Sequence, residues 1–166
     1  MISFLRVLAV SPSTYGVGFA VMEEPNLLID WGVKTSRSDK SVRCVSVVGN
    51  LIDYYKPDVF IVEDWKAKGF RRRSRIQALI EELSMLAASK RIKVQSISRA
   101  AVRKTFSPTG ALNKQQIATI IGGKFPELAS YIPPVRKPWM SEDYRMGIFD
   151  SVALGLNYLL HDRRGR

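Results

Sequence analysis

The stretch Val7 to Met22, VLAVSPSTYGVGFAVM, decides how the rest of the chain is interpreted. Two apolar runs of strand length flank a turn rich in serine, proline and glycine, a pattern typical of a β-hairpin. Ser11 stands where the first run ends, the position at which α/β proteins most often carry a functional side chain. The hairpin therefore predicts both the start of a sheet and the edge of that sheet at which a site is expected.

Length and composition set the outer bounds of the fold. The chain has 166 residues, 46% of them hydrophobic, and no linker-like stretch divides it, so we expect a single domain over residues 1–166. The lone cysteine, Cys44, excludes an internal disulfide and a cysteine-based zinc site. The sequence has no apolar run of membrane-spanning length and opens without a signal-peptide pattern, so we expect a soluble, cytoplasmic protein with no membrane partner.

The charge is strongly positive. Lysine and arginine total 26 against 15 acidic residues, a formal net charge of +11. A domain this basic attracts polyanions, with nucleic acid as the first expected partner and an anionic membrane surface as the second. The cations gather in two acid-free stretches, residues 66–75 and 83–126. A basic run can also be a solvated surface without a ligand, but two such runs beside the same candidate acids favour binding.

Hydrophobic periodicity indicates alternating strands and helices. The predicted elements are strands at residues 7–10, 16–22, 27–35, 59–62 and 92–97, and helices at 41–55, about 76–86, 99–106 after a Ser98 cap, 114–123 after an Asn113 cap, and about 145–160. Strand, helix and strand in this order imply a right-handed parallel crossover. The predicted fold class is α/β: an antiparallel three-strand meander plus parallel strands in one mixed sheet, flanked by helices.

Four segments, in their order along the chain, carry a family resemblance. VLAVSPSTYGVGFAV, PDVFIVEDW, SISRAAVRKTFSPTGALNKQQIATII and DSVALGLNYLL resemble the RuvC-type Holliday junction resolvases of the ribonuclease-H-like superfamily. The resemblance covers about residues 7–161 and implies a ribonuclease-H-like sheet. It also implies an endonuclease that binds branched DNA such as four-way junctions, hydrolyses phosphodiesters and acts as a homodimer.

The resemblance further implies a site for Mg²⁺ or Mn²⁺. Hydrolysis of a phosphodiester commonly uses two divalent ions about 4 Å apart, clamped by several carboxylates. The family's catalytic and metal-binding acids match Glu63 and Asp150. The other two family positions fall at Ser11 and Gly147, and neither residue supplies a carboxylate.

Neighbouring acids offer limited replacements. In a continuing strand Asp64 would point to the face opposite Glu63. Asp143 precedes Asp150 by seven residues, about 10 Å along a regular helix, unless the segment containing Glu142 and Asp143 folds back as a loop. We therefore keep Asp143, or Glu142 in its place, as a third candidate ligand.

The expected DNA-binding residues are basic and aromatic. The resemblance places Arg103 and Lys114 beside the scissile phosphate, and we expect further phosphate contacts from Arg71, Arg72, Arg73, Arg99 and Lys104. Trp65 and Phe70 follow Glu63 where resolvases carry an aromatic wedge; Trp65 either stacks on bases or packs beneath the loop. We expect Trp139 and Tyr144 to pack within their loop and His161 to be an ordinary surface residue.

Three classes of function fit these features unequally. The first is a metal-dependent resolvase-type endonuclease, and the second is a catalytically degenerate relative that binds structured nucleic acid without cutting it. The third, the actin-like ATPase and sugar-kinase fold, also opens on a glycine-containing hairpin. We disfavour it because those proteins repeat the fold in two lobes, for which 166 residues leave no room.

Overall fold

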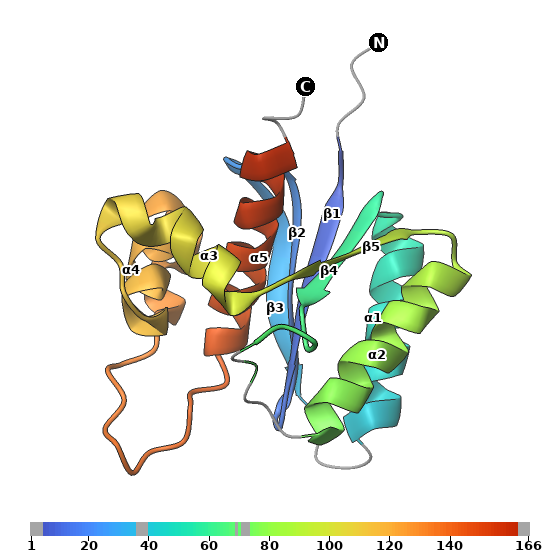
Figure 1. Cartoon of the computed structure of the whole chain (residues 1–166), viewed down its shortest axis with the longest axis horizontal. Coiled ribbons are helices and arrows are strands. Elements are labelled where there is room, and N and C mark those ends of the chain that lie inside the picture. The colour runs from blue at the N-terminus through green and yellow to red at the C-terminus, as the bar shows by residue number, and fades with distance from the viewer. Residues whose placement is uncertain (1–4, 36–39, 69, 71–73, 163–166) are drawn as a thin grey trace.

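The computed structural model describes residues 5–35, 40–68, 70 and 74–162. In these ranges a three-strand meander is followed by alternating helices and strands and then by three helices, much as the sequence predicts (Figure 1). The elements are β1 (Val7–Ser13), β2 (Gly16–Glu24), β3 (Leu27–Thr35), α1 (Lys40–Tyr55), β4 (Val59–Glu63), α2 (Ser74–Ser89), β5 (Lys93–Ile97), α3 (Arg99–Phe106), α4 (Lys114–Lys124) and α5 (Met146–Asp162). Two 3₁₀ turns, η1 (Ser107–Thr109) and η2 (Pro126–Tyr131), flank α4.

The strands form one mixed sheet in the order β3-β2-β1-β4-β5. β1 pairs antiparallel with β2 and parallel with β4, and β4 pairs parallel with β5. The predicted meander and parallel crossovers are therefore confirmed, with β1 at the centre. This arrangement brings the carboxyl ends of β1 and β4 to the same edge of the sheet.

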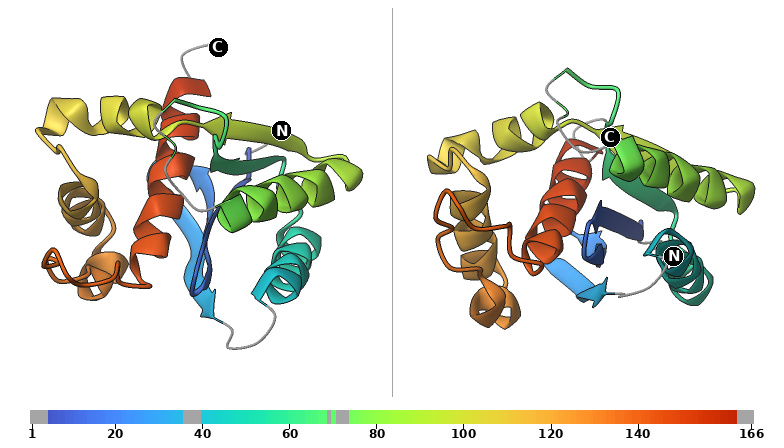
Figure 2. Two further views of the ribbon diagram at one scale, coloured as in Figure 1. Left: turned by 60° about the horizontal axis from the view of Figure 1, so that its bottom comes forward. Right: turned by 90° about the horizontal axis from the view of Figure 1, so that it is seen from below.

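Side-chain alternation divides the core into two layers. Val7 and Ala9 of β1 face a cluster built with α3, α4 and α5, whereas Leu8 and Val10 face a cluster built with α1 and α2. β4 alternates likewise, with Ile61 on the α5 face and Phe60 on the other. Figure 2 shows the two helical layers on opposite sides of the sheet. A strand buried on both faces needs apolar residues at every position, which explains the continuous apolar runs in β1 and β4.

The first strand extends three residues beyond the predicted end at Val10. It runs on through Pro12, opposite Val17 of β2. The β1–β4 register is formed only by Val7, Leu8 and Ala9 with their β4 partners, so at Pro12 the strand has one paired neighbour instead of two. A proline there removes no hydrogen bond from the centre of the sheet, and the strand continues.

Two helix caps form as the sequence predicts. The Ser98 hydroxyl accepts a hydrogen bond from Ala101 N at 3.1 Å, and the Asn113 amide oxygen accepts one from Gln116 N at 2.9 Å. Gln116 Oε1 in turn accepts from Leu112 N at 2.6 Å, one residue before the cap. These bonds satisfy backbone donors that the first helical turn leaves unpaired. They fix where α3 and α4, which carry the candidate phosphate-binding residues, begin.

Tyr55, the last residue of α1, ties that helix to the sheet. Its hydroxyl donates a short hydrogen bond to Asp30 of β3. Burial, reinforced by this bond and by the negative charge of Asp30, raises the pKa of Tyr55 to about 12. Tyr55 therefore remains a protonated donor at neutral pH.

Candidate nucleic-acid interface

The candidate site lies at the carboxyl ends of the two central parallel strands. The β1–β4 register ends with the pair Ala9 and Ile61, and Ser11 and Glu63 each follow two residues further along their strands. Both residues fall on the same face of the sheet as Ala9 and Ile61, the face that α5 covers. Glu63 is partly exposed, whereas Ser11 is buried. Two of the four family positions therefore meet at one edge of the sheet, as the resemblance implies.

Asp150 lies on α5, and its carboxylate forms an ion pair with a lysine of the same chain. Lys114 Nζ, from the first turn of α4, lies 3.1 Å from Asp150 Oδ2 and 3.2 Å from Glu142 Oε1. The side chains of Lys114 and Asp150 are only 22% and 18% exposed, so water screens their attraction incompletely. The ammonium group of Lys114 thus partly neutralises two of the candidate acids.

Asp143, the third candidate ligand, is hydrogen-bonded to an arginine. α5 begins only at Met146, so Asp143 is not one of its residues and lies in the turn before it. Arg145 donates Nε to Asp143 Oδ1 at 2.9 Å and Nη2 to Oδ2 at 2.8 Å. This forked hydrogen bond lowers the pKa of Asp143 below its usual value, and the pKa of Arg145 is raised in return. The segment is therefore a turn and not part of a regular helix, and a guanidinium holds the carboxylate of Asp143.

Ser11 and Gly147, the two family positions without a carboxylate, lie in a close contact between helix and hairpin. Ser11 Oγ lies 3.1 Å from Ser151 Oγ, which also lies 2.8 Å from Gly147 O. Each serine hydroxyl has one proton to donate. Both contacts are therefore hydrogen bonds when Ser151 donates to Gly147 O and Ser11 donates to Ser151 Oγ. Ser151 is completely buried. Ser151 is not among the residues that the sequence predicts for the site; the one sequence signal for it is its place directly after Asp150 on α5.

Gly18 of β2 and Gly147 of α5 make this contact possible. A Cβ atom at Gly18 would stand 2.5 Å from the carbonyl carbon of Gly147, and one at Gly147 would stand 3.3 Å from Gly18 Cα. A backbone-to-backbone approach this close excludes a side chain at Gly18 and leaves little room for one at Gly147. We refer to Ser11, Gly18, Gly147 and Ser151 as the helix–hairpin contact.

These residues do not fit a two-ion metal site. Within the described ranges, no group of three or more His, Cys, Asp or Glu side chains is placed to hold a metal ion. Of the four family positions, only Glu63 and Asp150 carry carboxylates, and Lys114 already pairs with Asp150. A pair of divalent ions needs several hard oxygen ligands, and losing carboxylates lowers the affinity. Binding of Mg²⁺ or Mn²⁺ by Glu63 and Asp150 stays a prediction.

The expected phosphate-binding residues separate into three groups. Arg103 and Lys104 are exposed in the last turn of α3, and Arg99 at its start is partly exposed. Lys114 is held by Glu142 and Asp150. The residues Arg71, Arg72 and Arg73 lie outside the described residues.

α3 is attached firmly to the helix that carries Asp150. Asn157 Nδ2 of α5 donates to Thr105 Oγ1 at 2.6 Å and to Ala101 O at 3.2 Å. These bonds lie on the inner side of α3, and Arg103 and Lys104 remain at the surface. A ligand at the carboxyl end of β4 would therefore meet a basic helix in a fixed position.

The aromatic residues near the candidate site differ in how deeply they are buried. Trp65 and Phe70 are partly buried against the α1–α2 side of the core, so for Trp65 packing beneath the loop is the arrangement observed. Trp139 and Tyr144 are 78% and 51% exposed, so the expectation that they pack within their loop is wrong. A proline-rich loop has few side chains of its own to cover a tryptophan. His161 is exposed, as expected.

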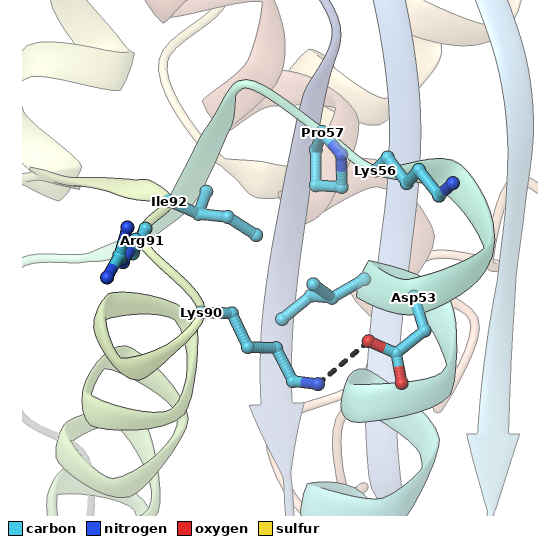
Figure 3. Close-up of a pocket in the computed structure, with 7 residues that line it drawn as sticks. Asp53, Lys56, Pro57, Lys90, Arg91 and Ile92 are labelled. Atoms are coloured by element: carbon cyan, nitrogen blue, oxygen red, sulfur yellow. Dashed lines mark hydrogen bonds and ion pairs between the residues drawn. The ribbon is translucent and has the colours of Figure 1, made fainter.

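A surface pocket lies elsewhere, between the ends of α1 and α2 (Figure 3). An ion pair of 2.7 Å between Lys90 Nζ and Asp53 Oδ1 spans it. Pro57 in its lining precedes β4, so the pocket lies at the end of that strand opposite Glu63. None of the candidate site residues lines it. Among the described residues, moreover, no helix is long and apolar enough to cross a lipid bilayer.

Comparisons with known proteins agree with this geometry. The crossover junction endodeoxyribonuclease RuvC of Prochlorococcus marinus strain MIT 9301 is 26% identical over 169 residues, covering 95% of this chain and 98% of the relative. RuvC of strain AS9601 is 27% identical over 124 residues, covering 68% of this chain and 77% of the relative. Thermus thermophilus RuvC, solved in complex with a Holliday junction substrate, matches 97% of this chain with a TM-score of 0.70 at 17% identity, and 96% of that chain is covered. No family model matches.

The mixed sheet, with its antiparallel and parallel strands flanked by helices, has a ribonuclease-H-like fold. In sequence the chain is similar to the RuvC-type Holliday junction resolvases, as the order of its four segments predicted. Ser11 and Gly147 are therefore the positions at which this chain departs from the acids that the resemblance implies.

Proposed function

We propose that this protein is a resolvase-type DNA-binding protein that recognises branched DNA, such as a four-way junction, in preference to a linear duplex. The observation that carries the proposal is the exposed basic surface of α3, which begins just after the carboxyl end of β5, where Ile97 pairs with Glu63, and is held by α5. Arg99, Arg103 and Lys104 would contact backbone phosphates there, and Arg71, Arg72 and Arg73 would add positive charge.

The geometry supports binding without cleavage over hydrolysis. Ser11 pairs with a buried serine, Gly147 has no side chain, and Lys114 partly neutralises Asp150. An ammonium group beside Asp150 lowers the negative potential that would attract a divalent cation. Within this proposal, Lys114 pairs with the largely buried carboxylate of Asp150. The pairing reduces the repulsion between that carboxylate and DNA phosphates that approach this edge of the sheet.

Metal-dependent hydrolysis of branched DNA is the second candidate, because Glu63 and position 11 both lie on the face that α5 covers. In that case Glu63 and Asp150 would be the catalytic and metal-binding acids, with Mg²⁺ or Mn²⁺ as the ion. Asp143 is a poor third ligand because Arg145 already binds both of its oxygens.

One experiment separates the two candidates. A labelled four-way junction and a linear duplex of the same composition are incubated with wild-type protein, with Glu63→Gln and with Asp150→Asn, in Mg²⁺ or Mn²⁺. We expect tighter binding of the junction than of the duplex and no cleavage product with either ion. Cleavage by the wild type that both variants abolish would establish the nuclease, and equal affinity for junction and duplex would contradict junction recognition.

We further propose that the protein binds the junction as a homodimer. A four-way junction has an approximate two-fold axis, and a two-fold dimer presents the same basic surface to both halves of it. Light scattering on the free protein and on its junction complex measures the stoichiometry. One protomer for each saturated junction would contradict the dimer.

A further inference from the structure

The segment between α4 and α5 carries an exposed loop that the proposed function leaves unexplained. All residues from 134 to 141, PVRKPWMS, are exposed, and they include two cations and no acid. We call this segment the arm; it belongs to the orange loop that extends away from the helices in Figure 1. A loop that leaves large apolar residues in water marks a binding surface more often than a packing element.

Both ends of the arm are attached to the first turn of α4. At its start, Gln115 Nε2 donates to Pro133 O at 2.7 Å. After its end, Lys114 Nζ binds both oxygens of Glu142 at 3.2 Å. Because neighbouring residues of one helix hold the two ends, the arm is a compact loop with a defined direction. The same lysine contacts Asp150, so the base of the arm adjoins the candidate site.

A tight turn presents Trp139 at the tip. Met140 N donates to Lys137 O at 2.9 Å, which closes a four-residue turn with Pro138 and Trp139 at its centre. Proline at the second position fixes the backbone angle that such a turn requires. The Trp139 side chain is 78% exposed, and Lys137 Nζ lies 5.4 Å from its ring. Tryptophan side chains are usually well buried. A tight turn that exposes one to solvent beside a lysine therefore indicates a ligand-binding position.

We propose that Trp139 stacks on an unpaired or unstacked base of the nucleic acid bound at the candidate interface, while Arg136 and Lys137 contact the adjacent phosphates. An aromatic ring flanked by cations matches the alternation of flat bases and anionic phosphates along a single strand. The arm has no acid to repel that strand, and the chain as a whole carries a charge of +11. This inference rests on the proposed function and adds a contact that reads unpaired bases.

The test compares three labelled DNAs of similar length: a four-way junction, a linear duplex and an oligo(dT) strand. Trp139→Ala should weaken binding of the junction and of oligo(dT) about tenfold, or about 1.4 kcal/mol. Binding of the duplex should change little, because its bases are already stacked. The salt dependence should remain as in the wild type because no charge is removed. Trp139→Phe, which keeps an aromatic face, should retain most of the affinity.

Tyr54 of α1 provides the matched control, since it is also 78% exposed but lies in the helical layer on the other face of the sheet. Tyr54→Ala should bind all three DNAs like the wild type. Fluorescence adds a direct readout, because Trp31 and Trp65 are partly buried whereas Trp139 is exposed. Oligo(dT) should quench the wild type, and Trp139→Phe should lose most of that quenching.

The outcomes separate this inference from the proposed function. Equal wild-type affinity for junction and duplex would overturn junction recognition, while oligo(dT) would still test Trp139. Trp139→Ala binding that equals wild type on junction and oligo(dT), or that falls equally on all three DNAs, would overturn base stacking. Wild-type protein that binds none of the three would overturn both proposals and assign the arm to a protein partner.

Discussion

The helix–hairpin contact and the arm both adjoin Asp150, the first through neighbouring residues of α5 and the second through Lys114 at its base. They differ in how far their side chains are exposed to solvent. The first brings Gly18 and Gly147 together so closely that a Cβ atom would meet backbone at 2.5 Å, around two buried serines. The second leaves every residue from 134 to 141 exposed. The two family positions without an acid, Ser11 and Gly147, are therefore closely packed, while the arm exposes cations and an aromatic ring. This difference favours recognition over hydrolysis.

The largest effect should come from opening the helix–hairpin contact. Gly18→Ala places a methyl group 2.5 Å from the Gly147 backbone, so β2 and α5 must separate, and the free energy of unfolding should fall by about 3 kcal/mol. Urea denaturation measures this change. Gly123→Ala in α4 is the control, because nothing lies within 4 Å of the added methyl group and stability should stay equal or rise by up to about 1 kcal/mol. Similar stabilities for the two variants would show that the contact is loose.

Restoring an acid at the strand end tests whether the closed region can hold a metal. Ser11→Asp buries a carboxylate, which should lower the free energy of unfolding by about 2 kcal/mol without metal. Mn²⁺ should then raise the melting temperature of this variant more than that of the wild type, because a cation compensates the added charge. Ser11→Asn has a similar shape without the charge and should not respond to Mn²⁺. An identical response of Ser11→Asp and Ser11→Asn would mean that position 11 does not face the site.

One arginine variant and one lysine variant compare an exposed cation, Arg103, with a cation that is paired with acids, Lys114. Arg103→Ala should reduce the slope of log K against log salt for junction binding by about one, as expected for one lost phosphate contact. Lys114→Gln should change that slope less, because Glu142 and Asp150 already pair with the ammonium, and it should lower the free energy of unfolding by about 1 kcal/mol. Salt titrations by fluorescence anisotropy measure the slopes. A larger change of slope for Lys114→Gln would make Lys114 the main phosphate contact.

The smallest effect should come from the ion pair that precedes α5. Arg145 lowers the folded-state pKa of Asp143, so the stabilisation is fully present above the unfolded-state pKa of about 3.9 and is lost as pH falls through the lower folded-state pKa. Asp143→Asn should therefore cost less than about 1 kcal/mol at pH 7, and this cost should shrink as the pH falls below the unfolded-state pKa. Unfolding free energies of both proteins across this range measure the difference. A cost that persists at pH 2 would assign it to the hydrogen bonds rather than to the charge.

Local patterns predicted most of the fold correctly. Residues 27–35 form β3 with the expected bounds, and Ser98 and Asn113 cap their helices. These features depend on side-chain periodicity and on bonds between residues close in the chain. The end of β1 was placed three residues too early because the absence of a second neighbour at Pro12 is a property of the sheet and is invisible in the local sequence.

The sequence by itself determined the mixed sheet, the basic charge and the identity of the residues at the four family positions, because these depend on composition, periodicity and order. Only the tertiary structure decided what those residues do. It joined Ser11 to Ser151 across 140 positions of sequence, set Lys114 against Asp150, and left Trp139 in solvent at the tip of the arm. Such pairings arise when α5 packs on the sheet, and no local pattern encodes them, because burial and proximity are shared between segments far apart in the chain.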